Sequence, residues 1–104
     1  MSQLTDSLVR EVFGDPTTAP IVVAYDATAV SAVALEAGVL YRFCSTTDCH
    51  VAFAAAPVAV VATCTPMTAG IPEYWKLNSG LKVAAIKRSV AGSLYITKMI
   101  GQRV

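Results

Sequence analysis

The sequence has few side chains that carry chemistry. It contains one histidine and three cysteines, its charged residues make up 14% of the chain, and its aromatic residues make up 8%. Eight lysines and arginines balance seven acidic residues, with no basic stripe and no acidic tail. Nucleic-acid binding depends on a cluster of positive charge that neutralises phosphates. We therefore predict no nucleic-acid partner.

Charge is also missing from a long internal stretch, residues 51–72. This stretch could in principle cross a membrane, but Pro57, Pro66, Pro72 and several threonines interrupt it. A spanning helix needs about 20 predominantly apolar residues and a backbone that satisfies its own hydrogen bonds. The first residues also lack a positive segment followed by an apolar run. We expect neither a membrane span nor a secretory signal.

Small apolar residues are abundant instead. Hydrophobic residues make up 55% of the 104 positions, and most of them are alanine and valine. A single domain of this size has a large surface for its volume and cannot bury so many apolar side chains internally. Contiguous apolar surface usually marks an interface. We therefore predict a homo-oligomer or a subunit of a larger assembly.

The first 19 residues differ from the rest and are predicted to form an arm or a short helix. Thr5 or Asp6 could cap a helix that runs through Phe13 and ends at Gly14. Three apolar residues recur every four positions and give it a narrow apolar stripe: Leu4, Leu8 and Val12. This segment could dock on its own domain or reach a neighbouring subunit.

Residues 20–104 have the pattern of a β domain. Short β-branched or apolar runs are separated by Gly, Pro, Asn and Ser turns at spacings of roughly 8–12 residues, which is typical of sandwiches and small barrels. We predict an all-β fold, a jelly-roll-like antiparallel sandwich of about eight strands. The predicted strands are 21–25, 30–35, 39–44, 49–54, 58–64, 73–77, 81–87 and 94–99, with a turn at 65–70.

The stretch FCSTTDCH, residues 43–50, holds two of the cysteines and the histidine. We predict a hairpin with Thr46 and Thr47 at its tip, in which Cys44 lies opposite Cys49. Alternation along the strand then places His50 on the face opposite Cys49. A disulfide between the two cysteines is geometrically conceivable, but it would leave the third cysteine over.

Two kinds of chemistry are conceivable for the same stretch. A zinc site would have to use Cys44, Cys49, His50 and Cys64, which lack the paired spacing of structural zinc sites. A Cys–His catalytic pair needs the two groups within hydrogen-bond reach and a third group to orient the base; Asp48 is better explained as a turn residue. We predict free buried thiols, no catalytic residue, no metal site and no cofactor.

Several apolar and aromatic residues are interface candidates. Residues 51–59 lose the polar–apolar alternation of a half-exposed strand, so both faces need a cover, which a second copy could supply. Tyr74 and Trp75 alternate, so one ring points inward and the other toward solvent or a partner; either could also stack on a sugar. With the N-terminal segment, the candidates are Leu4, Leu8, Val12, Phe13, Val51, Phe53, Val58, Tyr74 and Trp75.

The order of these segments resembles a known class of proteins. The relevant stretches are LEAGVLYRF at 35–43, DCHVAFA at 48–54, IPEYW at 71–75, NSGLKVAAI at 78–86 and GSLYIT at 92–97. Together they are similar to the small β-sandwich head decoration, or cement, proteins of tailed bacteriophages, over about residues 28–99.

The resemblance implies a non-enzymatic virion protein, made in the host cytoplasm and located on the capsid surface. It further implies a homo-oligomer, most simply a trimer, that binds the major capsid protein and stabilises the shell. No active-site residue carries over. The alternative hypothesis is a glycan-binding module for host recognition on a fibre or tail.

Overall fold

A computed structural model describes residues 11–14, 19–61 and 63–102, and in these ranges the chain forms nine β-strands. The strands are β1 Glu11–Gly14, β2 Ile21–Tyr25, β3 Ala29–Val30, β4 Leu40–Ser45, β5 Cys49–Ala54, β6 Thr65–Met67, β7 Glu73–Lys76, β8 Lys82–Lys87 and β9 Gly92–Gln102. No helix in these ranges is long or apolar enough to cross a lipid bilayer. The prediction of an all-β sandwich is confirmed.

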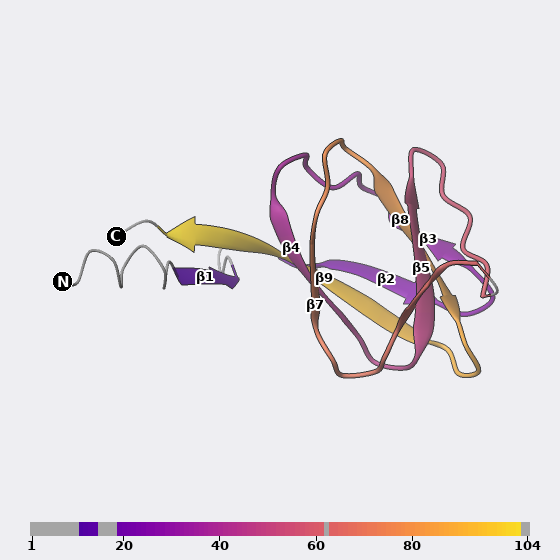
Figure 1. The fold of residues 1–104 in the computed structure, drawn as a ribbon. Coiled ribbons are helices and arrows are strands. Elements are labelled where there is room, and N and C mark those ends of the chain that lie inside the picture. Colours follow the sequence, from indigo (N-terminus) through magenta and orange to yellow (C-terminus); the bar gives the residue numbers. More distant parts are fainter. Residues whose placement is uncertain (1–10, 15–18, 62, 103–104) are drawn as a thin grey trace.

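Two antiparallel sheets pack face to face (Figure 1). In the first sheet β9 lies between β2 and β4, and β7 pairs with the far side of β4. The second sheet has the order β3-β8-β5-β6. From β2 to β9, the connections between consecutive strands pass from one sheet to the other, except that between β5 and β6, which stays within the second sheet. This is the strand order of a jelly roll, as predicted.

The long strand β9 extends beyond the sandwich. Its pairing with β4 ends at Lys98, which lies opposite Tyr41. Beyond that point, residues Met99 to Gln102 pair with β1 from Gly14 to Glu11. A two-stranded ribbon therefore leaves the sandwich at one end (Figure 1).

The core follows from alternation along the strands. In β4 the residues Tyr41, Phe43 and Ser45 are buried, whereas their neighbours are partly exposed. Phe43 is fully buried and makes edge contacts with two other rings, Phe53 at 5.7 Å and Trp75 at 4.8 Å between centroids. Such contacts add to the burial of apolar area that holds the two sheets together.

The predicted strand 30–35 is only the short β3, Ala29–Val30, and residues 31–35 are not a strand. Three further local predictions are wrong. Residues 11–14, predicted as the end of a helix, form β1, because pairing with β9 satisfies their backbone groups and outweighs local propensity. Residues 58–61 are not a strand, and β6 forms instead at 65–67, where we predicted a turn. The third error concerns residues 43–50. The connection is an arch between the two sheets rather than a hairpin, because β4 pairs with β7 and β9 whereas β5 pairs with β6 and β8.

The arch, residues 45–48, is held by hydrogen bonds from several parts of the chain. The Thr46 amide donates to the Ser93 carbonyl at 3.0 Å, and the Ser93 amide donates to Thr46 Oγ1 at 2.9 Å. The Tyr25 hydroxyl contacts the Thr47 carbonyl at 2.8 Å and Thr47 Oγ1 at 2.7 Å. On the other side, Asp48 Oδ1 accepts from the Ala69 amide at 2.8 Å. The arch therefore joins both sheets and the 68–70 turn.

Gly92 packs against this arch with no room for a side chain. A Cβ atom here would lie 2.6 Å from Thr46 Oγ1 and 2.8 Å from the Tyr25 hydroxyl, and closer still to Thr47 Oγ1. We expect Gly92→Ala to lower the free energy of unfolding by about 1–3 kcal/mol, because the arch must shift away. Urea denaturation measures the loss.

Gly80→Ala is the matched control. A Cβ at Gly80 meets the Leu35 carbonyl oxygen at 3.4 Å, which is an ordinary contact. We expect a change within about 1 kcal/mol for this variant. Equal stability of Gly92→Ala and the wild type would contradict the packing of the arch described above.

Candidate functional site

The cysteine and histidine side chains near the arch do not converge. Cys49 points into the core and is 1% exposed, whereas Cys44 lies on the outer face of the first sheet and is half-buried. His50 lies on the face of β5 opposite Cys49, as the alternation predicted, and across the ladder from Ile86. Cys44, Cys49 and Cys64 are free thiols. Among the described residues, no three His, Cys, Asp or Glu side chains come close enough to hold a metal ion.

The protonation of Cys49 also argues against nucleophilic chemistry. Burial raises the pKa of its thiol, and the charge of Asp48 acts in the same direction, while hydrogen bonds with Ser45 and Tyr25 oppose the shift. A catalytic cysteine needs the opposite, a lowered pKa that favours the thiolate. The Asp48 carboxylate accepts a hydrogen bond from the Ala69 amide and so stabilises the 68–70 turn.

The buried Cys49 thiol gives a direct test. In the native protein at about pH 8, we expect Cys49 to react with iodoacetamide more than tenfold more slowly than the half-buried Cys44. Peptide mass spectrometry after timed quenching measures both rates in one sample. Unfolding in urea should bring the two rates together, and equal rates in the native state would contradict the placement of Cys49.

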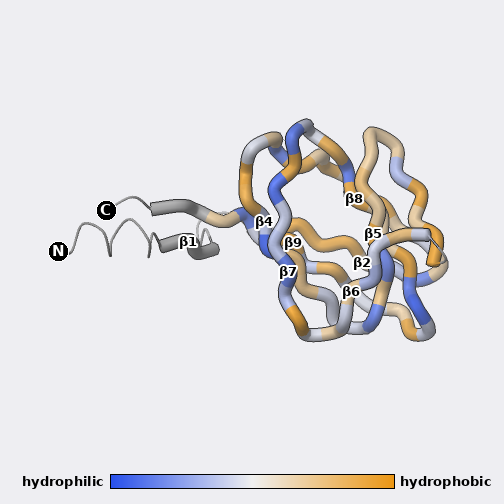
Figure 2. Tube along the Cα trace, in the orientation of Figure 1, coloured by the Kyte–Doolittle hydropathy of each residue, from blue (hydrophilic) through white to orange (hydrophobic). Residues whose placement is uncertain are grey.

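The second face of β5 is covered in part by the chain itself. Residues 55–61 run along the side of the second sheet that faces away from the first sheet (Figures 1 and 2). On the outer face of the second sheet, Ala84 is 0% and His50 6% exposed. Ala59 is 3% exposed, while Val58 points outward and is exposed. The apolar run at 51–59 therefore gains much of its second cover from within the subunit.

The structure separates the predicted interface residues into groups. Val51 lies in the core, and Phe53 and Trp75 pack against it with ring centroids 5.4 Å apart, so these three stabilise the subunit. Val58 and Tyr74 are exposed and stay candidates for contact with a partner. The remaining four are Leu4 and Leu8, which lie outside the described residues, and Val12 and Phe13, whose place on β1 is described but whose side chains are not.

The outer face of the first sheet brings together residues that the sequence did not connect. Arg42 on β4 lies opposite Tyr74 on β7 and opposite Thr97 on β9. Two residues further along β4, Cys44 lies opposite Tyr95 on β9. Tyr74 and Tyr95 are 51% and 43% exposed. We call Arg42, Tyr74, Tyr95 and Thr97 the tyrosine–arginine face.

The outer face of the first sheet, which contains these four residues, carries positive charge. The strand alternation places ten described residues on it: Val22, Ala24, Leu40, Arg42, Cys44, Tyr74, Lys76, Ser93, Tyr95 and Thr97. None of them is acidic. Within the described part of the chain, the ion pairs are formed by Lys87 and Lys98, and not by Arg42 or Lys76. Exposed tyrosine beside an unpaired arginine is the composition typical of protein interfaces.

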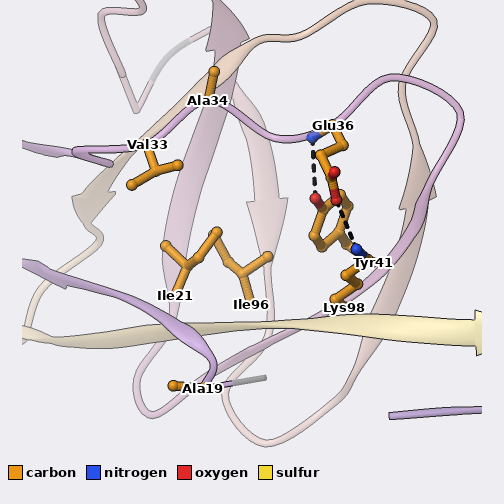
Figure 3. Close-up of a pocket in the computed structure, with 8 residues that line it drawn as sticks. All are labelled: Ala19, Ile21, Val33, Ala34, Glu36, Tyr41, Ile96 and Lys98. Carbon is orange, nitrogen blue, oxygen red and sulfur yellow. Dashed lines mark hydrogen bonds and ion pairs between the residues drawn. The ribbon is translucent and has the colours of Figure 1, made fainter. Parts of the chain in front are cut away.

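A pocket lies where the β1–β9 ribbon leaves the sandwich, with a volume of about 410 Å³ (Figure 3). Its residues are Ala19, Ile21, Val33, Ala34, Glu36, Tyr41, Ile96 and Lys98. On its polar side Lys98 Nζ is 2.9 Å from Glu36 Oε2, and the Glu36 amide donates to the Tyr41 hydroxyl at 3.0 Å. The hydrogen bond and charge of Lys98 lower the pKa of the Glu36 carboxyl.

The lowered pKa of Glu36 gives this ion pair a defined pH dependence. Its stabilising effect is present above the unfolded-state pKa, near the ordinary value of 4.5, and is lost as the pH falls through the lower folded-state pKa. We expect the small stability advantage of the wild type over Glu36→Gln at neutral pH to vanish in more acidic solution. Paired thermal melts across this pH range measure it, and a constant difference would contradict the ion pair.

Comparison with protein-family models, with curated proteins and with solved structures finds no match to this chain. The candidate sites therefore rest on the residues themselves. Sequence reasoning identified Tyr74 but missed Arg42, Tyr95 and the pocket. The alternation of residues along β4 and β9 could have shown that Arg42 and Tyr95 lie on outer faces of their strands. That the two residues lie close together could not be predicted, because it depends on the register between the strands.

Proposed function

We propose that this chain is a non-enzymatic structural protein of a bacteriophage virion, a decoration protein that binds the major capsid protein and stabilises the head shell. The observation that carries the proposal is the tyrosine–arginine face, a sheet surface on which Tyr74 and Tyr95 flank Arg42, which forms no ion pair with any residue that the structure describes. The resemblance over residues 28–99 supplies the class of partner. The jelly-roll strand order supports it by analogy, since viral capsid domains use this architecture.

The mechanism of stabilisation would be the removal of surface from water at junctions between shell subunits. Several exposed aliphatic side chains are available in addition to the tyrosines: Val30, Val33, Val58, Val60, Val61, Ile71 and Val90. At about 25 cal/mol per Å² of apolar area, modest contacts add up when many copies bind one shell. Assembly as a homotrimer would multiply the contacts made by each binding event. The protein would be made in the host cytoplasm and end on the capsid surface.

Binding to capsids tests the proposal. Expanded, undecorated shells of the major capsid protein from the same genome are incubated with the purified chain and sedimented. We expect saturable binding by the wild type and roughly 30-fold weaker binding by the double variant Arg42→Glu, Tyr74→Ala, because both changes remove interface anchors.

Lys82→Glu serves as the matched control, because it reverses a charge on β8 of the other sheet. It should bind like the wild type. Wild-type protein that shows no saturable binding would overturn the decoration role. Binding that is equally strong for the wild type and the double variant would retain the role and exclude this face as the contact.

A second candidate is the glycan-binding module on a fibre or tail. The observation that favours it is the same pair of exposed tyrosines, since lectin domains also use jelly rolls and aromatic rings stack on sugars. Trp75 packs against Phe43 and Phe53, so Tyr74 rather than Trp75 would be the stacking residue. Glycan-array binding that Tyr74→Ala removes, with no capsid binding, would support this function instead.

A further inference from the structure

The pocket at the ribbon end of the sandwich has the features of a small-molecule site. Its volume of about 410 Å³ falls within the range of roughly 300–1,000 Å³ that is common for ligand sites. It opens between β9 and the 33–36 segment, next to the last residue of β9 that pairs with β4 (Figure 3). Val33 is the one lining residue that the proposed capsid role also counts among its exposed aliphatic side chains, and the inference does not depend on that role.

The lining divides into an apolar part and a polar part. Five residues with aliphatic side chains line the rest of the pocket: Ala19, Ile21, Val33, Ala34 and Ile96. The polar groups gather on one side, where Glu36, Tyr41 and Lys98 contact one another (Figure 3). A bound molecule would therefore place an aliphatic chain against the isoleucines and a polar end against this group.

The charge of the polar side selects the ligand class. Lys98 Nζ and Glu36 Oε2 form an ion pair at 2.9 Å. The two opposite charges largely cancel each other, so neither strongly attracts a charge on a bound molecule. A carboxylate would meet the like charge of Glu36, and an ammonium group would meet that of Lys98. A neutral hydroxyl or carbonyl can share hydrogen bonds with this group without breaking the pair.

The geometry points to a site for a neutral amphiphile, a short aliphatic chain that ends in a hydroxyl or carbonyl group. The aliphatic chain lies on Ile21 and Ile96, and the polar end lies beside the Tyr41 hydroxyl and the Glu36–Lys98 pair. The aliphatic tail of the ligand is held by its burial against the isoleucines. Its neutral head is preferred because the opposite charges of Glu36 and Lys98 balance each other.

The test uses three probes of equal chain length, 1-hexanol, hexanoate and hexylammonium, in titrations followed by amide shifts in NMR spectra of the full chain. We expect saturable shifts for 1-hexanol, centred on residues 33–36 and 96–98, and binding about fivefold weaker for each charged probe. Linear shifts without saturation, or equal binding of all three probes, would overturn the proposal.

Two sets of variants locate the site. Val33→Trp places a large side chain over the isoleucines and should abolish the saturable shifts, while Ala37→Trp, an exposed neighbour outside the lining, should retain them. Glu36→Gln removes the negative charge that opposes hexanoate, so hexanoate should bind more strongly relative to hexylammonium than it does to the wild type. Retained binding in Val33→Trp, or an unchanged ratio of hexanoate to hexylammonium binding in Glu36→Gln, would each show that the molecule binds elsewhere.

Discussion

The fold depends on where the chain changes sheets between β4 and β5. Both strands are central, β4 between β7 and β9 and β5 between β6 and β8, so the connection between them sets the position of one sheet against the other. Three residues, Thr46 to Asp48, link the two strands, and the backbone, hydroxyl and carboxylate groups of the arch bond to β2, to the turn before β9 and to residues 69 and 70. Hydrogen bonds to so many separate segments favour one arrangement of the two sheets, because any other would break several of them.

The same crossing explains the properties of the cysteines. Cys44 precedes the arch and lies on the outside of one sheet, whereas Cys49 follows it and points into the core from the other. A hairpin would have placed the two side chains opposite each other on one face. Once the chain crosses between sheets, the residues that seemed closest in the sequence become unrelated in space. The stretch is thus a structural connection between the two sheets.

Much of the fold could be predicted from the sequence, and the errors have physical reasons. Periodic burial located strands such as β2, β5 and β8 within a residue or two, because alternation depends on each strand alone. A short polar connection suits either a hairpin or an arch, and the choice is made by core packing and distant hydrogen bonds. Residues 58–61 contain valines that favour a strand, yet they cross the outside of the second sheet as a loop. The candidate sites were less predictable, since the tyrosine–arginine face and the pocket depend on register and on the meeting of distant segments.

The place of β9 has a consequence for synthesis of the protein on the ribosome. Among the described strands β9 comes last in chain order, yet it pairs with β1, β2 and β4 and stands in the middle of the first sheet. While β9 is still inside the exit tunnel, the emerging chain has neither a completed first sheet nor a closed core. Long-range pairing of this kind is slow and leaves strand edges exposed until it is complete. The nascent domain must therefore stay soluble until β9 has left the exit tunnel, and it can reach its native state only after that point.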